Sequence, residues 1–481
     1  MLLKNDDFKI DVTSEIGNLR ALLIHSPDSG LGKVVPSKAQ DWLFEDIVHL
    51  DTVRKNEYDY YVKLLMYFLD ADKIKGKLKT IDAPAHRRAF FKPDNAGFHA
   101  SNKVIEIQTL LADILLDAGI RKKLVASVCA IESCNYRLQE KLIDTDPVEL
   151  AKILISGSLE NDEMIFAPIP NLIFSRDVGI TINNYVLLNR PAKKARARET
   201  LLMRYIFFNH PLFAKYQHNI LEIPESMQHF LRPGEDNTER TTLEGGDVMM
   251  VSPQHLLIGC SERTSPTGAN EAIKLLFEHN VVEKITVVKI PHKRDYMHID
   301  TVFTQVKRNV WVLLGSLAIG ESPIEDKEPL SWFADKKSKD KTEIVQFRKG
   351  KKTKKFDCIE DLLSNISEKD LQSEEKTRFI YSGNGAFPYD AREQWTDSCN
   401  LLAVKEGVVI GYDRNDKTVE AFKQNGFDVI KVKELIEKFE NNEIDPQTMK
   451  DTLILMPSAE LSRARGGFHC MSMPILRDKI M

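Results

Sequence analysis

The sequence predicts an α/β protein in which one small structural unit recurs along the chain. Three observations support this fold class: short β-rich runs occur in pairs joined by turns, a helical stretch often follows, and a third β-rich run closes several of the units. A pseudo-symmetric α/β ring of such units would place its strand ends around one central cavity. With 481 residues, the chain is long enough for a large core and for more than one structural unit.

The predicted strands fall at regular places between turn signals. Single strands or strand pairs are expected, in chain order, at residues 19–24, 177–189, 247–259, 301–315 and 400–411. Two of these units are more complete, with a helix and a third strand expected at residues 270–277 and 284–289, and at residues 417–424 and 429–432.

Residues 72–160 break this pattern and predict an inserted helical subdomain. An apolar ladder that ends at a glycine predicts one helix across residues 101–119. An aspartate N-cap followed by proline, with a glycine stop, predicts another across residues 146–157. The remaining segments, residues 1–71 and 161–481, are expected to form the α/β domain.

A second block, residues 321–375, is predicted to be an irregular, lysine-rich insertion within the α/β domain. It contains basic runs at residues 336–339 and 348–355. A basic run usually marks a solvated loop or edge, and a patch for nucleic acid or an acidic partner is the alternative. Because the 67 basic and 71 acidic residues nearly balance, we expect no nucleic-acid partner.

Composition also bears on compartment and cofactors. No apolar run approaches the roughly 20 residues that a membrane span requires, and the N-terminus lacks the apolar stretch of a signal peptide. Six cysteines in so long a chain do not form a disulfide framework, and Cys129 and Cys134 are not spaced as zinc ligands. We therefore expect a cytoplasmic protein with reduced thiols, no membrane partner and no metal. The sequence leaves the oligomeric state open, a homo-oligomer included.

The most informative segment lies near the C-terminus. Cys470 follows the glycine pair 466–467, where the backbone can approach a ligand closely, and its neighbours Arg465 and His469 are polar. A lone cysteine is more often a small buried residue. The setting nevertheless makes Cys470 a candidate nucleophile, whereas the other five cysteines lie in apolar or helical segments and are expected to be structural.

Acidic residues stand at the start of several predicted strand pairs. Asp177 begins one pair, and Glu244 and Asp247 flank two glycines directly before another. His298 and Asp300 are two residues apart in an extended segment, so their side chains face the same side. Each acid alone is equally typical of a turn or a surface ion pair. A ring of units, however, would bring all of them together.

This combination suits chemistry on a guanidinium group. A guanidinium is planar and cationic, and carboxylates match its donors in pairs. Carboxylates would hold the cation so that a thiolate meets its central carbon face-on. An imidazole would then protonate the leaving amine and later deprotonate a water molecule. This chemistry requires no cofactor.

On these residues, the chain resembles the arginine deiminases of the guanidine-modifying (pentein, amidinotransferase-like) superfamily. The resemblance runs through nearly the whole chain, and the order of the motifs makes it specific. The segments that carry it are residues 14–20, 24–27, 170–177, 196–200, 244–247, 261–264, 298–300, 392–395 and 470–474.

The resemblance implies a fold and a reaction. The fold would be a five-fold pseudo-symmetric ββαβ propeller with an inserted helical subdomain. The reaction would be hydrolysis of free L-arginine to L-citrulline and ammonia through a covalent S-alkylthiouronium intermediate. Transfer of the amidino group to an amine, or an arginine dihydrolase reaction, remains an alternative, as does a non-catalytic binding scaffold that acts through the lysine-rich block.

The resemblance also implies roles for single residues. Cys470 would be the nucleophile and His298 the general acid/base, oriented by Glu244. Asp177 and Asp300 would hold the guanidinium. The other implied site residues are Asn171, Arg196 and Arg263 at the amino-acid end of the substrate, Asp247 at the rim, and Arg465 and His469 beside the nucleophile. The chain is longer than typical members near residues 73–99 and in the lysine-rich block, and the purpose of these additions is open.

Overall fold

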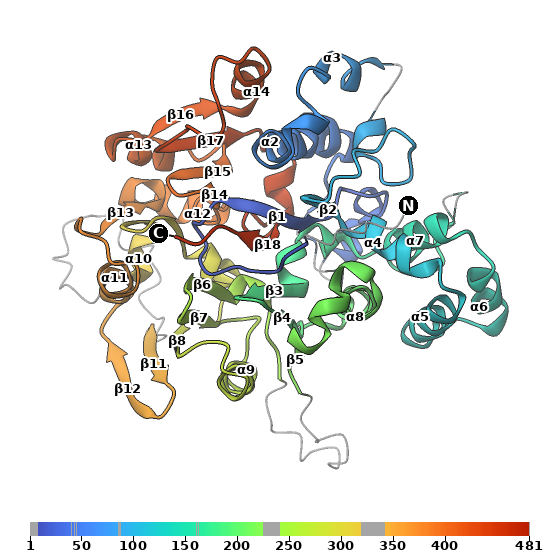
Figure 1. The fold of residues 1–481 in the computed structure, drawn as a ribbon, viewed down its shortest axis with the longest axis horizontal. Coiled ribbons are helices and arrows are strands. Elements are labelled where there is room, and N and C mark those ends of the chain that lie inside the picture. Colours follow the sequence, from blue (N-terminus) through green and yellow to red (C-terminus); the bar gives the residue numbers. More distant parts are fainter. Residues whose placement is uncertain are drawn as a thin grey trace.

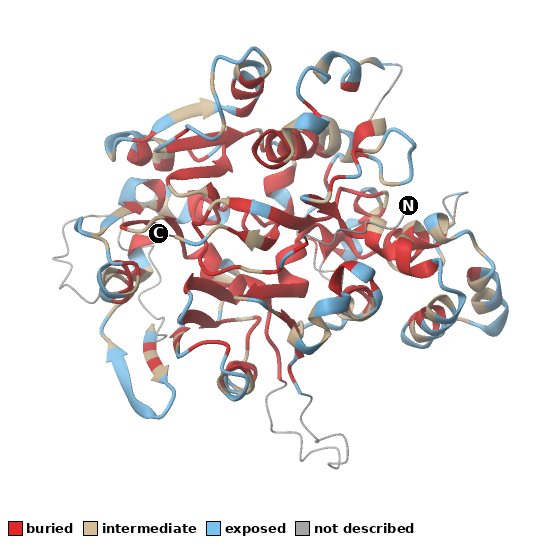
Figure 2. Ribbon diagram, viewed as in Figure 1, coloured by how far each residue is buried: buried red, intermediate tan, exposed pale blue. Residues whose placement is uncertain are grey.

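Short strands in five separate sheets form the centre of the described part of the chain (Figure 1). The computed structural model describes residues 8–480, apart from residues 40, 43, 45, 85–87, 160, 162, 225–240 and 319–341. The protein is a mixed α/β structure, as the sequence predicted. The strands of these sheets are mostly buried, and the exposed surface lies largely on the surrounding helices and on one hairpin (Figure 2).

One topology recurs in all five described sheets: an antiparallel strand pair is extended by a third strand parallel to its second member. The first sheet joins the two ends of the chain, because its pair consists of β18 (Met473–Arg477) and β1 (Leu19–Ile24), followed by β2 (Val104–Glu106). The other four sets of three are β3 (Gly179–Ile182), β4 (Tyr185–Leu188) and β5 (Ile220–Glu222); β6 (Val248–Ser252), β7 (His255–Cys260) and β8 (Lys284–Lys289); β9 (Phe303–Lys307), β10 (Val310–Leu313) and β13 (Arg378–Tyr381); and β14 (Leu402–Lys405), β15 (Val408–Tyr412) and β17 (Thr452–Met456).

The last unit differs from the expected order. The strand predicted at residues 429–432 is β16 (Asp428–Lys431), but it pairs with β17 and not with β15. All five residues of β17 are buried, whereas those of β16 are half-buried or exposed. The apolar strand therefore takes the inner position and β16 lies at the edge of the sheet.

Part of the lysine-rich block is regular, in contrast to the irregular insertion that the sequence predicted. Strands β11 (Glu343–Arg348) and β12 (Lys351–Phe356) form a hairpin that extends the sheet of β8. Ile344 and Gln346 alternate inward on β11, while β12 is exposed along most of its length (Figure 2). The alternation spans only a few residues, so the neighbouring lysines obscure it in the sequence. The basic run at residues 336–339 lies outside the described residues.

Helices surround the sheets, and a group of them, α4 to α7, lies to one side in Figure 1. The described α-helices are α1 (Leu50–Thr52), α2 (Asp59–Leu69), α3 (Leu78–Ile81), α4 (Ile107–Leu115), α5 (Ala118–Ile131), α6 (Tyr136–Ile143), α7 (Pro147–Ser156), α8 (Ala197–Asn209), α9 (Pro266–Glu278), α10 (Gly315–Ala318), α11 (Ile359–Asn365), α12 (Tyr389–Trp395), α13 (Asp416–Gln424) and α14 (Val432–Glu440). In the part of the chain that the structure describes, no helix combines the length and apolarity that a bilayer crossing demands.

The helix predicted across residues 101–119 is wrong in its boundaries. Its first part is strand β2, which runs parallel to β1, and pairing with the sheet overrides the helical spacing of the apolar residues. Glu106 then accepts a hydrogen bond from Gln108 N and begins α4. Gly119 does not stop a helix, because Asp117 caps α5 by accepting from Gly119 N and Ile120 N.

The helix predicted across residues 146–157 is confirmed as α7, together with both of its end signals. The side chain of Asp146 accepts from Val148 N and Glu149 N at 2.9 and 3.3 Å. Gly157 ends the helix in the left-handed conformation at φ 73°.

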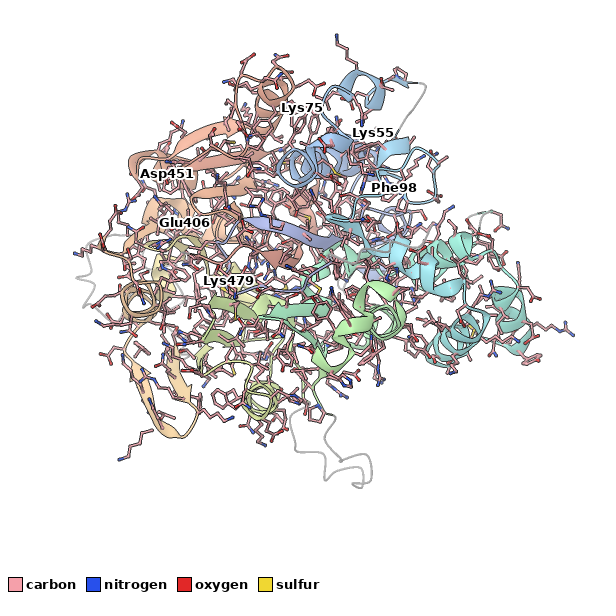
Figure 3. All side chains as sticks on the ribbon, in the orientation of Figure 1. Lys55, Lys75, Phe98, Glu406, Asp451 and Lys479 are labelled. Carbon is pink, nitrogen blue, oxygen red and sulfur yellow. The ribbon has the colours of Figure 1, made fainter. Side chains whose placement is uncertain are left out.

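Ion pairs join neighbouring sheets at their outer turns. Glu406, in the turn between β14 and β15, pairs with Arg308 at 3.0 Å, and Asp451 pairs with Lys307 at 2.9 Å (Figure 3). Arg308 follows β9 and Lys307 ends it, so both pairs connect the β9–β10 sheet to the β14–β17 sheet.

An aromatic cluster supports the C-terminal segment from inside the core. The ring of Phe468 packs between Tyr61 of α2 and Tyr412 of β15, with centroid distances of 5.0 and 4.9 Å. The hydroxyl of Tyr412 also donates to Gly466 O at 2.9 Å. These contacts fix the backbone on the N-terminal side of Cys470.

We predict that Phe468→Ala lowers the free energy of unfolding by about 3–5 kcal/mol, because it leaves a cavity between two buried rings. Urea denaturation followed by fluorescence measures this. Phe387→Ala is the control, since Phe387 is 53% exposed and its loss should change stability little. A change of similar size in both variants would contradict the role of the aromatic cluster.

Candidate active site

A short turn precedes the first strand of every unit and carries the polar residues of the site. In each turn, the backbone N–H of one residue donates to the carbonyl three residues earlier. The five turns are residues 174–177, 244–247, 298–301, 397–400 and 469–472, and they precede β3, β6, β9, β14 and β18. The repeated topology therefore directs five loops, far apart in the sequence, to one place.

Eight of the eleven predicted site residues line a single cavity among the described residues. They are Asn171, Asp177, Arg196, Glu244, Arg263, His298, Arg465 and Cys470. The other three, Asp247, Asp300 and His469, are buried behind this lining.

His298 and Glu244 form a buried ion pair at the cavity. The imidazole Nε2 lies 3.0 Å from Glu244 Oε2. Burial alone would lower the pKa of His298, but Asp177, Glu244 and Asp247 outweigh it and raise the pKa to about 10. Burial would raise the pKa of Glu244, yet His298 and the nearby arginines lower it to about 2. At neutral pH, the pair is an imidazolium held by a carboxylate.

Glycine at position 246 is required by this arrangement. A Cβ atom there would lie 2.5 Å from Nδ1 of His298, closer than two such atoms can approach. The glycine pair that the sequence suggested as a turn thus also makes room for the imidazole. Asp247, next in the chain, turns away from the cavity and accepts from Ile299 N at 2.9 Å and from Ser261 Oγ at 2.6 Å. It is buried and anchors the loop of His298, so it does not lie at the rim as predicted.

Asp177 already holds a guanidinium, that of Arg196. Arg196 Nη1 lies 2.8 Å from Asp177 Oδ2 and 3.5 Å from Glu244 Oε2, and Arg196 Nε donates to Glu199 Oε2 at 2.8 Å. Three acids therefore surround one buried arginine. Burial raises the pKa of Glu199 to about 7, against the effect of Arg196. The sequence placed Arg196 at the carboxylate end of a substrate, but here its charge faces the acids.

The same carboxylates bear on metal binding. Asp177, Glu244 and His298 present ligand atoms within 4.8 Å of one another, a spacing that suits a cation. In this structure, the cation between the two carboxylates is the Arg196 guanidinium, and His298 is bound to Glu244. The site is thus arranged to neutralise a guanidinium with carboxylates.

The thiol of Cys470 lies against Asp300. Sγ is 3.3 Å from Asp300 Oδ2, and the thiol donates to this oxygen. Burial, followed by the charges of Asp300, Asp177 and Asp397, raises the pKa of Cys470 well above its usual value. The resting thiol is therefore protonated. Asp300 Oδ1 is buried, has no hydrogen-bond partner among the described residues, and lies 4.0 Å from Nδ1 of His298.

His469 lies behind Asp300 and not in the cavity. Its Nδ1 is 2.9 Å from Asp300 Oδ2, and its Nε2 is 3.2 Å from Glu15 Oε2. Arg176 also pairs with Glu15, at 3.2 Å, and donates to His469 O at 2.8 Å. This buried chain of alternating charges fixes the orientation of Asp300. Burial would raise the pKa of Asp300, but His469 lowers it, so Asp300 is ionised.

The remaining predicted residues, Asn171, Arg263 and Arg465, also line the cavity. Arg263 donates to Glu262 at 2.8 Å, and Asn171 donates to Trp42 O at 2.7 Å. The guanidinium of Arg465 stacks on the ring of Trp395 at 3.6 Å from its centroid.

Sequence reasoning missed two polar residues of the turn at residues 397–400. Asp397 lines the cavity, accepts from Gly466 N at 3.0 Å, and has a pKa that burial raises to about 7. The side chain of Asn400 accepts from Cys470 N and donates to Cys470 Sγ. The sequence could have indicated Asn400, because this polar residue stands at the start of a predicted strand pair, as the identified acids do.

Comparisons with known proteins identify the family. The arginine deiminase family model matches residues 80–435. An arginine deiminase of Borrelia recurrentis (strain A1) is 30% identical over 482 residues, covering 98% of each chain, and one of Latilactobacillus sakei is 30% identical over 476 residues, covering 98% of this chain and 99% of the relative. Among solved structures, an amidinotransferase of Microseira wollei from the saxitoxin biosynthetic pathway aligns over 98% of each chain at 11% identity and a TM-score of 0.48, too low to establish a shared fold. The family match and the similarity along the full length of these relatives show that this chain is a member of the arginine deiminase family.

Proposed function

We propose that the protein hydrolyses free L-arginine to L-citrulline and ammonia, with Cys470 as the nucleophile. Family membership and the relatives named arginine deiminase support this reaction. The observation that carries it is the buried carboxylate of Asp300. Its Oδ2 contacts the thiol, and its Oδ1 lies 4.0 Å from the imidazole and has no donor among the described residues. A buried carboxylate oxygen without a donor is costly, and a substrate guanidinium would supply the missing hydrogen bond.

The substrate cation prepares the nucleophile. In the resting site, the surrounding acids keep the thiol of Cys470 protonated. A guanidinium that binds Asp177 and Asp300 adds a positive charge next to the sulfur and lowers the pKa of the thiol, so its proton leaves to solvent. Each carboxylate oxygen can accept more than one hydrogen bond, so Asp177 can hold the substrate while it retains Arg196.

The covalent steps then use His298 twice. The thiolate attacks the guanidinium carbon to give a tetrahedral adduct. His298, protonated at neutral pH, donates its proton to the leaving nitrogen, and ammonia departs to leave the S-alkylthiouronium cation. The neutral imidazole takes a proton from water, whose oxygen attacks the same carbon. Collapse expels the thiolate and one proton and releases citrulline.

Roles toward the amino-acid end of the substrate follow from charge. We propose that Arg263 and Asn171 bind the amino-acid end of the substrate, since an arginine side chain forms charge-assisted hydrogen bonds with an α-carboxylate. Arg465 stacks on Trp395 at the cavity wall beside the nucleophile.

We further propose that the sheets form the five-fold ββαβ propeller that the sequence predicted. The support is the single topology shared by the five described sheets, with the first closed by β1 and β18 from opposite ends of the chain. In this proposal, residues 72–160 are an insertion between the first and second units, and residues 1–71 and 161–481 form the catalytic domain. We also propose a cytoplasmic location, where thiols stay reduced; no disulfide bond joins the described cysteines.

Replacing Cys470 with serine should lower citrulline formation by at least about 10³-fold, because a hydroxyl is a far weaker nucleophile in this site. Chromatography of products from purified protein and L-arginine measures this. Cys358→Ser, at a half-buried cysteine outside the cavity, is the control. Undiminished citrulline in Cys470→Ser would refute the assignment, and ornithine or a new guanidino compound from the unaltered protein would show a different reaction.

The alkaline limit of activity should follow His298. Its folded pKa of about 10 lies above the ordinary value of 6.5, so the acid form persists through neutral pH and is lost as the pH rises through about 10. Glu244→Gln removes a partner that raises this pKa, so the alkaline limb of kcat/KM should move down by about one pH unit or more. Glu406→Gln, at a remote ion pair, should leave the limb in place. An unmoved limb in Glu244→Gln would argue against His298 as the acid.

Arg263→Ala should raise KM for L-arginine about 10–100-fold with a smaller change in kcat, because contacts to the carboxylate form before and during the reaction. Agmatine, which has the guanidinium but no carboxylate, provides the matched substrate. Its turnover should be low in the unaltered protein and unchanged by the substitution. An equal loss on both substrates would place Arg263 elsewhere in the reaction.

A further inference from the structure

The turn at residues 397–400 contributes a side chain whose place in the site matches those of the identified residues. Asn400 lies two residues before the β14–β15 pair and is 1% exposed. Its side-chain Nδ2 is 3.2 Å from Sγ of Cys470. It therefore touches the atom that would carry out the first covalent step.

Two backbone groups fix which end of the Asn400 amide faces the sulfur. Cys470 N, which can only donate, lies 3.1 Å from Oδ1, and Asp300 O, which can only accept, lies 3.3 Å from Nδ2. Rotating the amide by 180° would place two donors together and two acceptors together. The N–H group must therefore point at the sulfur, whatever the protonation state of the thiol.

The neighbouring loop is shaped to admit this side chain. A Cβ atom at Gly467 would lie 2.4 Å from Asn400 O and 2.7 Å from its Oδ1. Glycine at position 467 thus permits the close approach of two chain segments 70 residues apart. The amide is thus held by Cys470 N, Asp300 O and the sulfur before any substrate binds.

We propose that Asn400 is a catalytic residue that donates a hydrogen bond to the Cys470 thiolate. The inference rests on the proposed role of Cys470 as nucleophile. In the resting site, the thiol donates to Asp300 and the sulfur accepts from Asn400. Once the thiol has lost its proton, the sulfur no longer donates to Asp300, and the two negative charges repel each other. The amide then stabilises the charge that the acids oppose, both before attack and when the sulfur is expelled.

Alkylation of Cys470 by iodoacetamide reports the thiolate directly, without substrate. The rate is followed from pH 7 to 10 by mass spectrometry of the peptide that contains Cys470, which separates it from the other five cysteines. Asn400→Asp keeps an oxygen for Cys470 N but removes the donor, and Asn400→Ala removes the amide without adding charge. Either variant loses a hydrogen bond to the thiolate, so the alkylation rate of Cys470 should rise at a pH about one unit or more higher. At a fixed pH below the midpoint of this profile, alkylation should be about tenfold slower.

Asn415→Asp is the matched control, because Asn415 is also buried, and its amide hydrogen bonds go to Thr396. It should leave the profile of Cys470 in place. Unchanged alkylation in folded Asn400→Asp, or in folded Asn400→Ala where the aspartate variant does not fold, would overturn the inference. If the unaltered protein makes no citrulline, the proposed function fails, whereas the alkylation comparison still decides whether the amide acts on the sulfur.

Discussion

The site depends on a buried thiol that lies among carboxylates. Asp300 contacts the sulfur of Cys470, and Asp177 and Asp397 add further negative charge, so ionisation of the thiol is opposed in the resting protein. Such a site disfavours the thiolate form of Cys470 until a cation enters it. In the proposed reaction, the substrate is that cation, and the electrostatic cost of making the nucleophile is offset by the molecule that is to be attacked. A neutral analogue would not provide this effect.

The acids are tolerated in the core because each has a fixed partner. Glu244 holds the imidazolium of His298, Asp177 holds Arg196, and Asp300 is held by His469. A buried charge without a partner would destabilise the fold. Asp300 Oδ1 lacks a hydrogen-bond donor among the described residues, and in the proposed reaction the substrate guanidinium would supply one.

The repeated topology explains how five short turns, far apart in the sequence, form one site. Each unit places one turn directly before its first strand, and each of the five turns supplies a side chain that contacts the sulfur, the imidazole or the acids around them. The glycine pairs at 245–246 and 466–467 allow these loops to pack together. The loops approach so closely that a side chain at these positions would overlap its neighbours. Chemistry and packing are therefore set by the same short segments.

The sequence by itself determined the local features. It predicted the strand pairs, the caps of α7, and the types of residue that the chemistry needs, because each depends on neighbours a few positions away. The tertiary structure alone decided the strand status of residues 104–106, the inner position of β17 and the hairpin β11–β12, since these depend on distant strands. It also decided that Arg196 faces Asp177, that Asp247 and His469 stand behind the cavity, and that Asn400 touches Cys470. The pKa values of the site belong to this second group, because burial and charges brought from other loops, and not residue type, set the protonation states.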